Sequence, residues 1–98
     1  MSVINSTSTK IIANKAELKK VLAKTLTNLI TQKKWTDKDA AKELDINQSW
    51  VSDFAKGVLK NITIDDMLDL FVKFGYKSEL KKSSIKDMVD LTLTKNQS

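Results

Sequence analysis

The sequence of 98 residues contains no cysteine, no histidine and no proline, and all 17 of its basic residues are lysine. The lack of cysteine excludes disulfide bonds and thiol nucleophiles, and the lack of both cysteine and histidine excludes the usual zinc sites. Acid–base catalysis by imidazole is excluded as well. An enzyme of this composition would depend on lysine, serine, tyrosine and carboxylates alone. We therefore predict a protein that is not an enzyme and that needs no cofactor and no metal.

The sequence also has no long apolar run. Hydrophobic residues make up 41% and charged residues 30%, which is an ordinary balance for one small globular domain. No stretch is long and apolar enough to cross a bilayer. Residues 1–9 are rich in serine, threonine and asparagine and do not resemble a secretory signal. We expect a cytoplasmic protein that does not associate with membranes.

The net charge of +5 is unevenly distributed along the chain. Residues 1–34 contain seven lysines and one acidic residue, whereas residues 35–98 contain ten lysines and eleven acidic residues. A cationic surface attracts polyanions, of which nucleic acid is the commonest and an anionic membrane the next. A lysine-rich surface that is merely solvated is the alternative, so charge by itself does not decide between these readings.

The first part of the chain predicts a flexible arm followed by a long helix. Residues 1–13 have no sustained periodicity, and Asn14 followed by Glu17 has the spacing of a capping box. Beyond it, apolar residues recur at steps of three and four, while Lys20 and Lys24 fall on the opposite side. The pattern predicts an amphipathic helix of about twenty residues with a core face made of Leu18, Val21, Leu22, Leu26, Leu29 and Ile30.

Two short helices are predicted next, separated by a tight turn at residues 45–47. Thr36 is a suitable N-cap for the first helix, whose inner face is Ala40, Ala41 and Leu44. Asn47 is a suitable N-cap for the second, which spans residues 48–56. Gly57 then ends the second helix, because glycine adopts the left-handed conformation without steric cost.

A fourth helix is predicted between residues 63 and 75. Thr63 and Asp66 form a second capping box ahead of a strongly apolar stretch, and Gly75 ends the pattern. Asp65, Asp66 and Asp69 could suggest a metal site. Acidic residues at the start of a helix more often stabilise its N-terminus, and we assign them that role.

Residues 78–98 are predicted to form an association segment. Apolar and polar residues alternate over residues 88–94, which favours a β-strand. Ser84 with Asp87 would also suit a capped helical turn there. A single strand cannot satisfy its own hydrogen-bonding groups. A strand would therefore pair with residues 76–80, with a second subunit or with a partner protein.

Residues 36–57 resemble the helix-turn-helix of the Xre and lambda-repressor-like family of bacterial and phage regulators. The resemblance depends on Thr36 as first cap, the small pair Ala40 and Ala41, and Gly57 as the stop. It continues over residues 62–76, which are similar to the next helix of a subgroup that includes many antitoxins. The resemblance implies a mainly α fold, namely a bundle of four to five helices with the DNA-binding domain over residues 14–77. A short C-terminal β-strand is added if the alternating pattern of residues 88–94, and not the helical turn, decides the structure there.

The resemblance also implies which residues face DNA. In such folds the second helix enters the major groove by its N-terminal end. We accordingly expect Gln48, Ser49 and Asp53 to contact bases, although Asp53 could instead pair with Lys56. Trp50 is expected either to touch DNA or to lie at the edge of the core. The expected contacts with the DNA backbone are Lys33, Lys34, Thr36, Lys38, Asn47, Trp50, Ser52, Lys56 and Lys60.

Two positions depart from the family pattern. Asp37 stands where the family commonly has a glutamine that touches phosphate, and Asp45 stands at the usual turn glycine. Asp45 is compatible with the turn because aspartate enters the left-handed region more readily than most residues. A carboxylate at position 37 would be repelled by phosphate unless the helix N-terminus or a nearby lysine offsets it.

The sequence thus predicts a transcriptional regulator that binds duplex DNA sequence-specifically, as a repressor and as a homodimer on a palindromic operator. The alternative is an antitoxin that mainly neutralises a cognate protein toxin and regulates its own operon by binding DNA. Double-stranded DNA is the expected partner in both cases.

Overall fold

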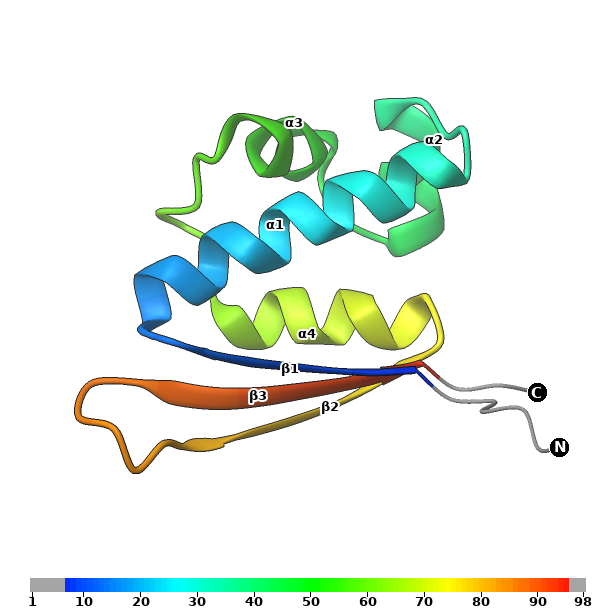
Figure 1. Ribbon diagram of the computed structural model, residues 1–98. Helices are drawn as coiled ribbons and strands as arrows, with labels where there is room; N and C mark the ends of the chain where they lie inside the picture. The colour runs from blue at the N-terminus through cyan, green and yellow to red at the C-terminus, as the bar shows by residue number, and fades with distance from the viewer. Residues whose placement is uncertain (1–6, 96–98) are drawn as a thin grey trace, which may run out of the picture.

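In the structure, a computed structural model that describes residues 7–95, four helices lie on one side of an antiparallel three-stranded sheet (Figure 1). The predicted mainly α fold with a C-terminal strand is confirmed, although two further strands accompany that strand. No helix in this range is both long and apolar enough to cross a membrane. In chain order the elements are β1 (Thr7–Ala13), α1 (Lys15–Gln32), α2 (Asp37–Leu44), α3 (Gln48–Lys56), α4 (Ile64–Lys73), β2 (Tyr76–Lys82) and β3 (Val89–Lys95).

The helices begin where the capping signals predict. Asn14 Oδ1 accepts a hydrogen bond from the backbone N–H of Glu17 at 2.8 Å, and Thr36 Oγ1 accepts one from the backbone N–H of Asp39 at 3.1 Å. At α4 the capping box is complete, because Thr63 and Asp66 each accept from the other's backbone N–H at 3.0 Å. Each such cap contributes about 1 kcal/mol to the stability of its helix.

The core face of α1 is narrower than predicted. Leu18, Leu22, Leu26 and Ile30 are buried, as expected, but Val21 is 38% exposed. Ala23 is buried in its place. The buried stripe of α1 therefore includes Ala23 and leaves Val21 outside it.

Strand β3 is the central strand of the sheet and confirms the predicted C-terminal strand. The strand order is β1-β3-β2, and both pairings are antiparallel. Leu91 and Leu93 are buried beneath the helices, whereas the alternating residues Asp90, Thr92 and Thr94 lie on the face away from the helices. Of the pairing options, residues 76–80 are confirmed as a partner within β2. The helical turn at Ser84 does not form, because residues 83–88 make the connection between β2 and β3.

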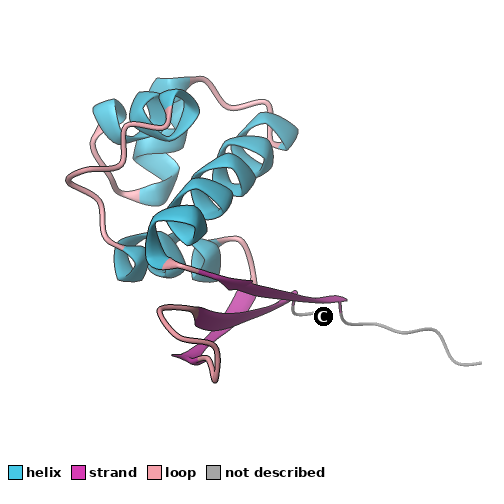
Figure 2. Cartoon of the chain, turned by 60° about the vertical axis from the view of Figure 1, so that its left-hand side comes forward, coloured by secondary structure: helices cyan, strands magenta, loops and turns pink. Residues whose placement is uncertain are grey.

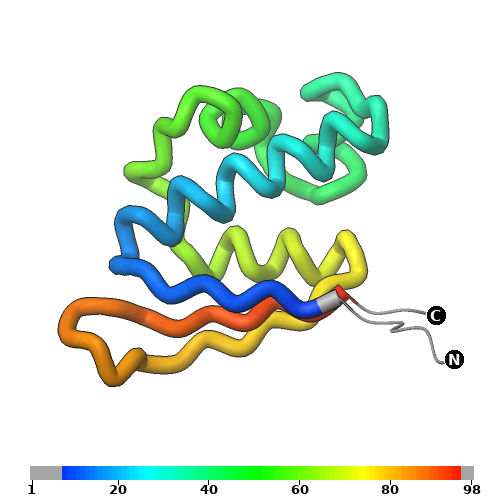
Figure 3. The backbone as a smooth tube through the Cα atoms, viewed as in Figure 1, coloured from blue at the N-terminus to red at the C-terminus, as the bar shows by residue number. Residues whose placement is uncertain are grey.

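The expectation of a flexible arm over residues 1–13 is wrong for Thr7–Ala13, which form β1; residues 1–6 lie outside the described residues. Strand β1 runs beside β3, so that the two ends of the described chain lie next to each other (Figure 3). Ile11 is the register partner of Leu91, 80 positions later in the chain. Because this pairing is so distant in sequence, no local pattern around β1 indicates it.

Two aromatic contacts connect the helices to one another and to the sheet. The ring of Phe71 is fully buried and meets Tyr76 of β2 edge to face, with 5.6 Å between ring centroids. Trp35 lies 5.9 Å from Phe74. Trp35, in the connection between α1 and α2, thus packs against the end of α4.

Candidate nucleic-acid interface

Helices α2 and α3, with their caps and turn, form a unit over residues 36–57 that we call the α2–α3 unit. It lies on the far side of the helical layer from the sheet, as Figures 1 and 2 both show. The buried Ala40 lets the two helices contact each other closely. Asp45 ends α2 in the left-handed conformation at φ 57°, and the backbone N–H of Ile46 donates to Ala41 O at 3.0 Å. These contacts make the turn between the helices short and fixed.

The underside of α3 is anchored to the rest of the domain. Val51 and Phe54 are buried, and α3 contacts α1. Gly57 ends the helix at φ 76°, where the backbone N–H of Val58 donates to Asp53 O at 3.0 Å. Lys73 of α4 donates to the backbone oxygen of Leu44 and so fixes the end of α2 as well. The α2–α3 unit is therefore held from beneath by both α1 and α4.

The first turn of α3 is open to solvent. Gln48 and Ser49 are exposed, and Asp53, one turn later, is half-buried. Asn47 occupies the predicted N-cap position, but its side chain makes no capping hydrogen bond. Its amide therefore has donors and acceptors available for a ligand, as the side chains of Gln48 and Ser49 do.

Trp50 lies at the edge of the core. It is half-buried, and its ring meets Phe54 edge to face at 6.4 Å between centroids. Together with Asp45, Ile46 and Asn47 it lines a hollow of about 330 Å³ beside the turn. The geometry matches the core-edge alternative for this residue, so a contact of Trp50 with DNA stays a prediction.

The remaining predicted contacts surround the α2–α3 unit. Lys33 is the C-cap of α1, and Lys34, with φ at 60°, begins the connection to α2. Thr36 uses its hydroxyl oxygen as the cap of α2. Ser52 is half-buried, whereas the lysines of this set are exposed, namely Lys33, Lys34, Lys38, Lys56 and Lys60.

The charge of the α2–α3 unit is opposite to that of the whole chain. Residues 36–57 contain three lysines and five acidic residues, Asp37, Asp39, Glu43, Asp45 and Asp53. Phosphate would be repelled by most of these carboxylates. We therefore expect contacts with a phosphate backbone to come mainly from lysines that flank the unit, such as Lys34 on one side and Lys60 on the other.

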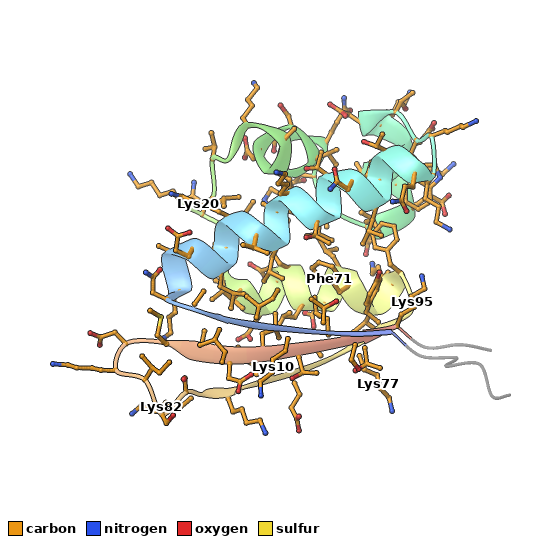
Figure 4. The ribbon with its side chains drawn as sticks, in the orientation of Figure 1. Lys10, Lys20, Phe71, Lys77, Lys82 and Lys95 are labelled. Atoms are coloured by element: carbon orange, nitrogen blue, oxygen red, sulfur yellow. The ribbon has the colours of Figure 1, made fainter. Side chains whose placement is uncertain are left out.

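Two such lysines come from α1, where the sequence did not indicate them. Lys20 and Lys24 line a hollow of about 340 Å³ with Lys56 and Gly57 at the end of α3. Figure 4 shows Lys20 extending outward from the first half of α1. The sequence placed both lysines on a solvated helix face, because the side on which α3 packs against α1 cannot be deduced from α1 alone. Their only local signal is the i, i+4 spacing of two lysines.

A family model for a helix-turn-helix domain matches residues 8–88 of the chain. The match contains the whole α2–α3 unit and extends from β1 to the connection between β2 and β3. The chain belongs to this helix-turn-helix family. Comparisons with curated proteins and with solved structures find no match. Helix-turn-helix domains are characteristic of DNA-binding regulators, so membership of this family supports DNA binding by the chain.

The helix-turn-helix geometry gives Lys24 a testable role. We expect Lys24→Ala to weaken binding to every duplex sequence alike and to reduce the slope of log affinity against log salt concentration by about 1 for each bound chain, because each chain loses one phosphate contact. Fluorescence anisotropy with labelled duplexes at several salt concentrations measures this slope. Lys86→Ala, in the connection between β2 and β3, is the matched control and should leave it unchanged. Equal slopes for Lys24→Ala and the wild type would contradict a contact between Lys24 and a DNA phosphate.

Proposed function

We propose that this helix-turn-helix protein is a sequence-specific transcriptional regulator of the Xre and lambda-repressor-like type. It acts as a repressor by occupying an operator in duplex DNA, so its mechanism is occlusion of the site, without chemical catalysis. Gln48, Ser49 and Asp53 contact base edges. The exposed lysines around the α2–α3 unit contact phosphates, joined by the polar groups of Thr36, Asn47 and Ser52.

One observation carries this proposal: the first turn of α3 is uncovered while its underside is buried. Gln48 and Ser49 are exposed, whereas Val51 and Phe54 hold the helix in the core. A helix anchored in this way fits a major groove of about 12 Å width with its N-terminal end. Gln can bond adenine N6 and N7 together, and Ser can donate or accept, so both side chains suit readout of base edges.

A dimer with two such helices would read two half-sites. Two-fold symmetry places the half-sites one helical turn apart, roughly 34 Å, and makes the operator palindromic. Selection of bound duplexes from a random pool tests the proposal. We expect enrichment of one palindromic sequence with half-site centres about 10 base pairs apart. A pool that stays random after several rounds would contradict sequence-specific binding.

An antitoxin role is the second candidate, and one surface favours it. Beneath the β2–β3 hairpin, Leu80, Met88 and Val89 line a hollow of about 670 Å³ together with Lys15, Lys81, Lys82 and Asp87. Such an apolar hollow, unused by the α2–α3 unit, suits a partner protein. Co-expression with the product of a neighbouring short reading frame tests this role. Co-purification and loss of that product's toxicity are expected, and a product that purifies alone would contradict it.

A further inference from the structure

The sheet has two edges, and they differ in charge. Strand β2 carries Lys77, Glu79, Lys81 and Lys82 among its seven residues. Lysines on an edge strand are a common way to keep that edge unpaired. Strand β1 carries Lys10 alone, and the Lys10 ammonium lies 3.4 Å from the Asp90 carboxylate. The β1 edge is therefore the one with little uncompensated charge.

The β1 edge is also the more apolar of the two. Ile11 packs against the core on the helix side, whereas Ile12 is 47% exposed on the other face. Residues 7–13 are rich in threonine and isoleucine, which favour strands. Within residues 7–95 no strand pairs with the outer edge of β1, so this edge presents backbone N–H and C=O groups to a further strand.

We propose that β1 pairs antiparallel with β1 of a second copy of this chain and joins the two sheets into one of six strands. This inference rests on the dimer of the proposed function and assigns its interface. A second copy is the occupant because pairing of β1 with itself uses the β1 edges of both copies at once, so that the assembly closes as a two-fold dimer. If a strand from another protein occupied the β1 edge, that pairing would not join two copies of this chain into a dimer.

The charges and side-chain sizes along β1 select one register. With Ile11 opposite Ile11 of the second copy, Lys10 of each chain lies opposite Ile12 of the other. The aliphatic stem of Lys10 then covers the exposed Ile12. Centring the pairing on Lys10 would set two ammonium groups directly opposite each other, which is unfavourable.

The same register adds positive charge near Asp90. Asp90 lies across from Ile12 on β3, and its Oδ1 is buried without a hydrogen-bond partner among the described residues. Lys10 of the second copy comes to the other side of Ile12, two strand spacings from this carboxylate. This added charge is favourable in sign, while Lys10 of the same chain stays the direct partner of Asp90 at 3.4 Å.

The joined sheet also suits DNA binding. Two antiparallel strands in one sheet are related by a two-fold axis perpendicular to it, so both helical layers remain on the same side. Because the α2–α3 unit lies on the far side of each helical layer from the sheet (Figures 1 and 2), both units face the same direction. One duplex can then meet both copies of α3.

Ile12→Lys tests the interface. It sets a new ammonium group opposite Lys10 of the second copy, while Asp90 of its own chain lies across from position 12 and keeps the monomer fold stable. We expect the dissociation constant of the dimer to rise about tenfold or more. At a protein concentration just above the wild-type dissociation constant, the mass by light scattering should therefore fall from near twice the chain mass toward 11.0 kDa. Leu80→Lys, on the β2 edge with 38% exposure, is the matched control and should stay dimeric.

Cross-linking provides a second test that does not depend on destabilising the dimer. The chain has no native cysteine. Directly opposite residues in an antiparallel pair have Cα atoms about 4.5–5.5 Å apart, within reach of a disulfide. Ile11→Cys should give a disulfide-linked dimer under mild oxidation, and Leu80→Cys should not.

The outcomes separate this inference from the proposed function. Three results would overturn the inference: a wild type that is monomeric with and without DNA, an Ile12→Lys variant that stays dimeric, or loss of the dimer in Leu80→Lys. A monomeric wild type that still enriches one non-palindromic sequence would leave DNA reading by α3 intact. Conversely, a dimer cross-linked through residue 11 that enriches no sequence would uphold the interface and contradict the proposed function.

Discussion

Phe71→Ala is expected to lower the free energy of unfolding by about 3–5 kcal/mol, the usual cost of removing a fully buried phenylalanine. Phe71 is 0% exposed, and its ring meets Tyr76 at the start of β2. Removing it leaves a cavity between α4 and the sheet and also deletes an edge-to-face contact. A fall of this size is a large fraction of the stability of a small domain.

Urea unfolding followed by tryptophan fluorescence measures this change, since Trp35 and Trp50 both lie against the core. Val72→Ala is the matched control: Val72 is the next residue of α4 and is 60% exposed. We expect it to change stability by no more than about 0.5 kcal/mol. If the two variants unfolded at the same urea concentration, α4 would not be packed on the sheet as described.

Affinity for the operator is expected to fall by about 10³ to 10⁵ between 50 and 200 mM salt, if a dimer neutralises roughly 6–10 phosphates. Each phosphate contact releases condensed counterions, and release is less favourable when salt is abundant. We expect the flanking lysines to supply these contacts, because the α2–α3 unit itself carries more acidic than basic residues. Lys34, Lys60 and the α1 pair Lys20 and Lys24 are the main candidates.

A titration of binding against salt concentration measures this effect. Non-specific duplex of the same length is the control, and its affinity should fall steeply as well, because phosphate contacts are independent of sequence. Affinity that stays flat from low to high salt would contradict recognition of a phosphate backbone by these lysines.

The helix boundaries could be predicted from the sequence because their causes are local. Asn14, Thr36 and Thr63 cap the helices that follow them, and each bonds to a residue only three positions later. Gly57 and Gly75 adopt positive φ where the helical patterns stop. The left-handed Asp45 in the turn was likewise expected from the properties of its own side chain.

The sheet was only partly predictable because its strands pair with partners that are far away in the sequence. The alternation of Leu91 and Leu93 with polar residues indicated β3. Strand β1, in contrast, is stabilised by register partners such as Ile11 and Leu91 that are far apart in the chain. Trp35 illustrates the same limit, since its contact with Phe74 depends on where α4 ends relative to α2.

The sequence predicted the exposed first turn of α3 at the centre of the candidate site, but not the lysines of α1 that lie beside it. The exposure of Gln48 and Ser49 follows from helical spacing, once Val51 and Phe54 are placed in the core. The nearness of Lys20 and Lys24 to Lys56 follows from the packing of α1 against α3, which no single segment encodes. Charge at the rim is therefore a property of the assembled fold.

The most direct test of base reading by α3 is the affinity of Gln48→Ala for the selected operator and for unrelated duplex, measured side by side at one salt concentration. We expect a loss of about 1–3 kcal/mol on the operator, roughly 5- to 150-fold, and almost no change on unrelated duplex. Lys56→Ala, at the other end of the same helix, should weaken both alike. Equal affinities of Gln48→Ala and the wild type for the operator would contradict the reading of bases by the first turn of α3.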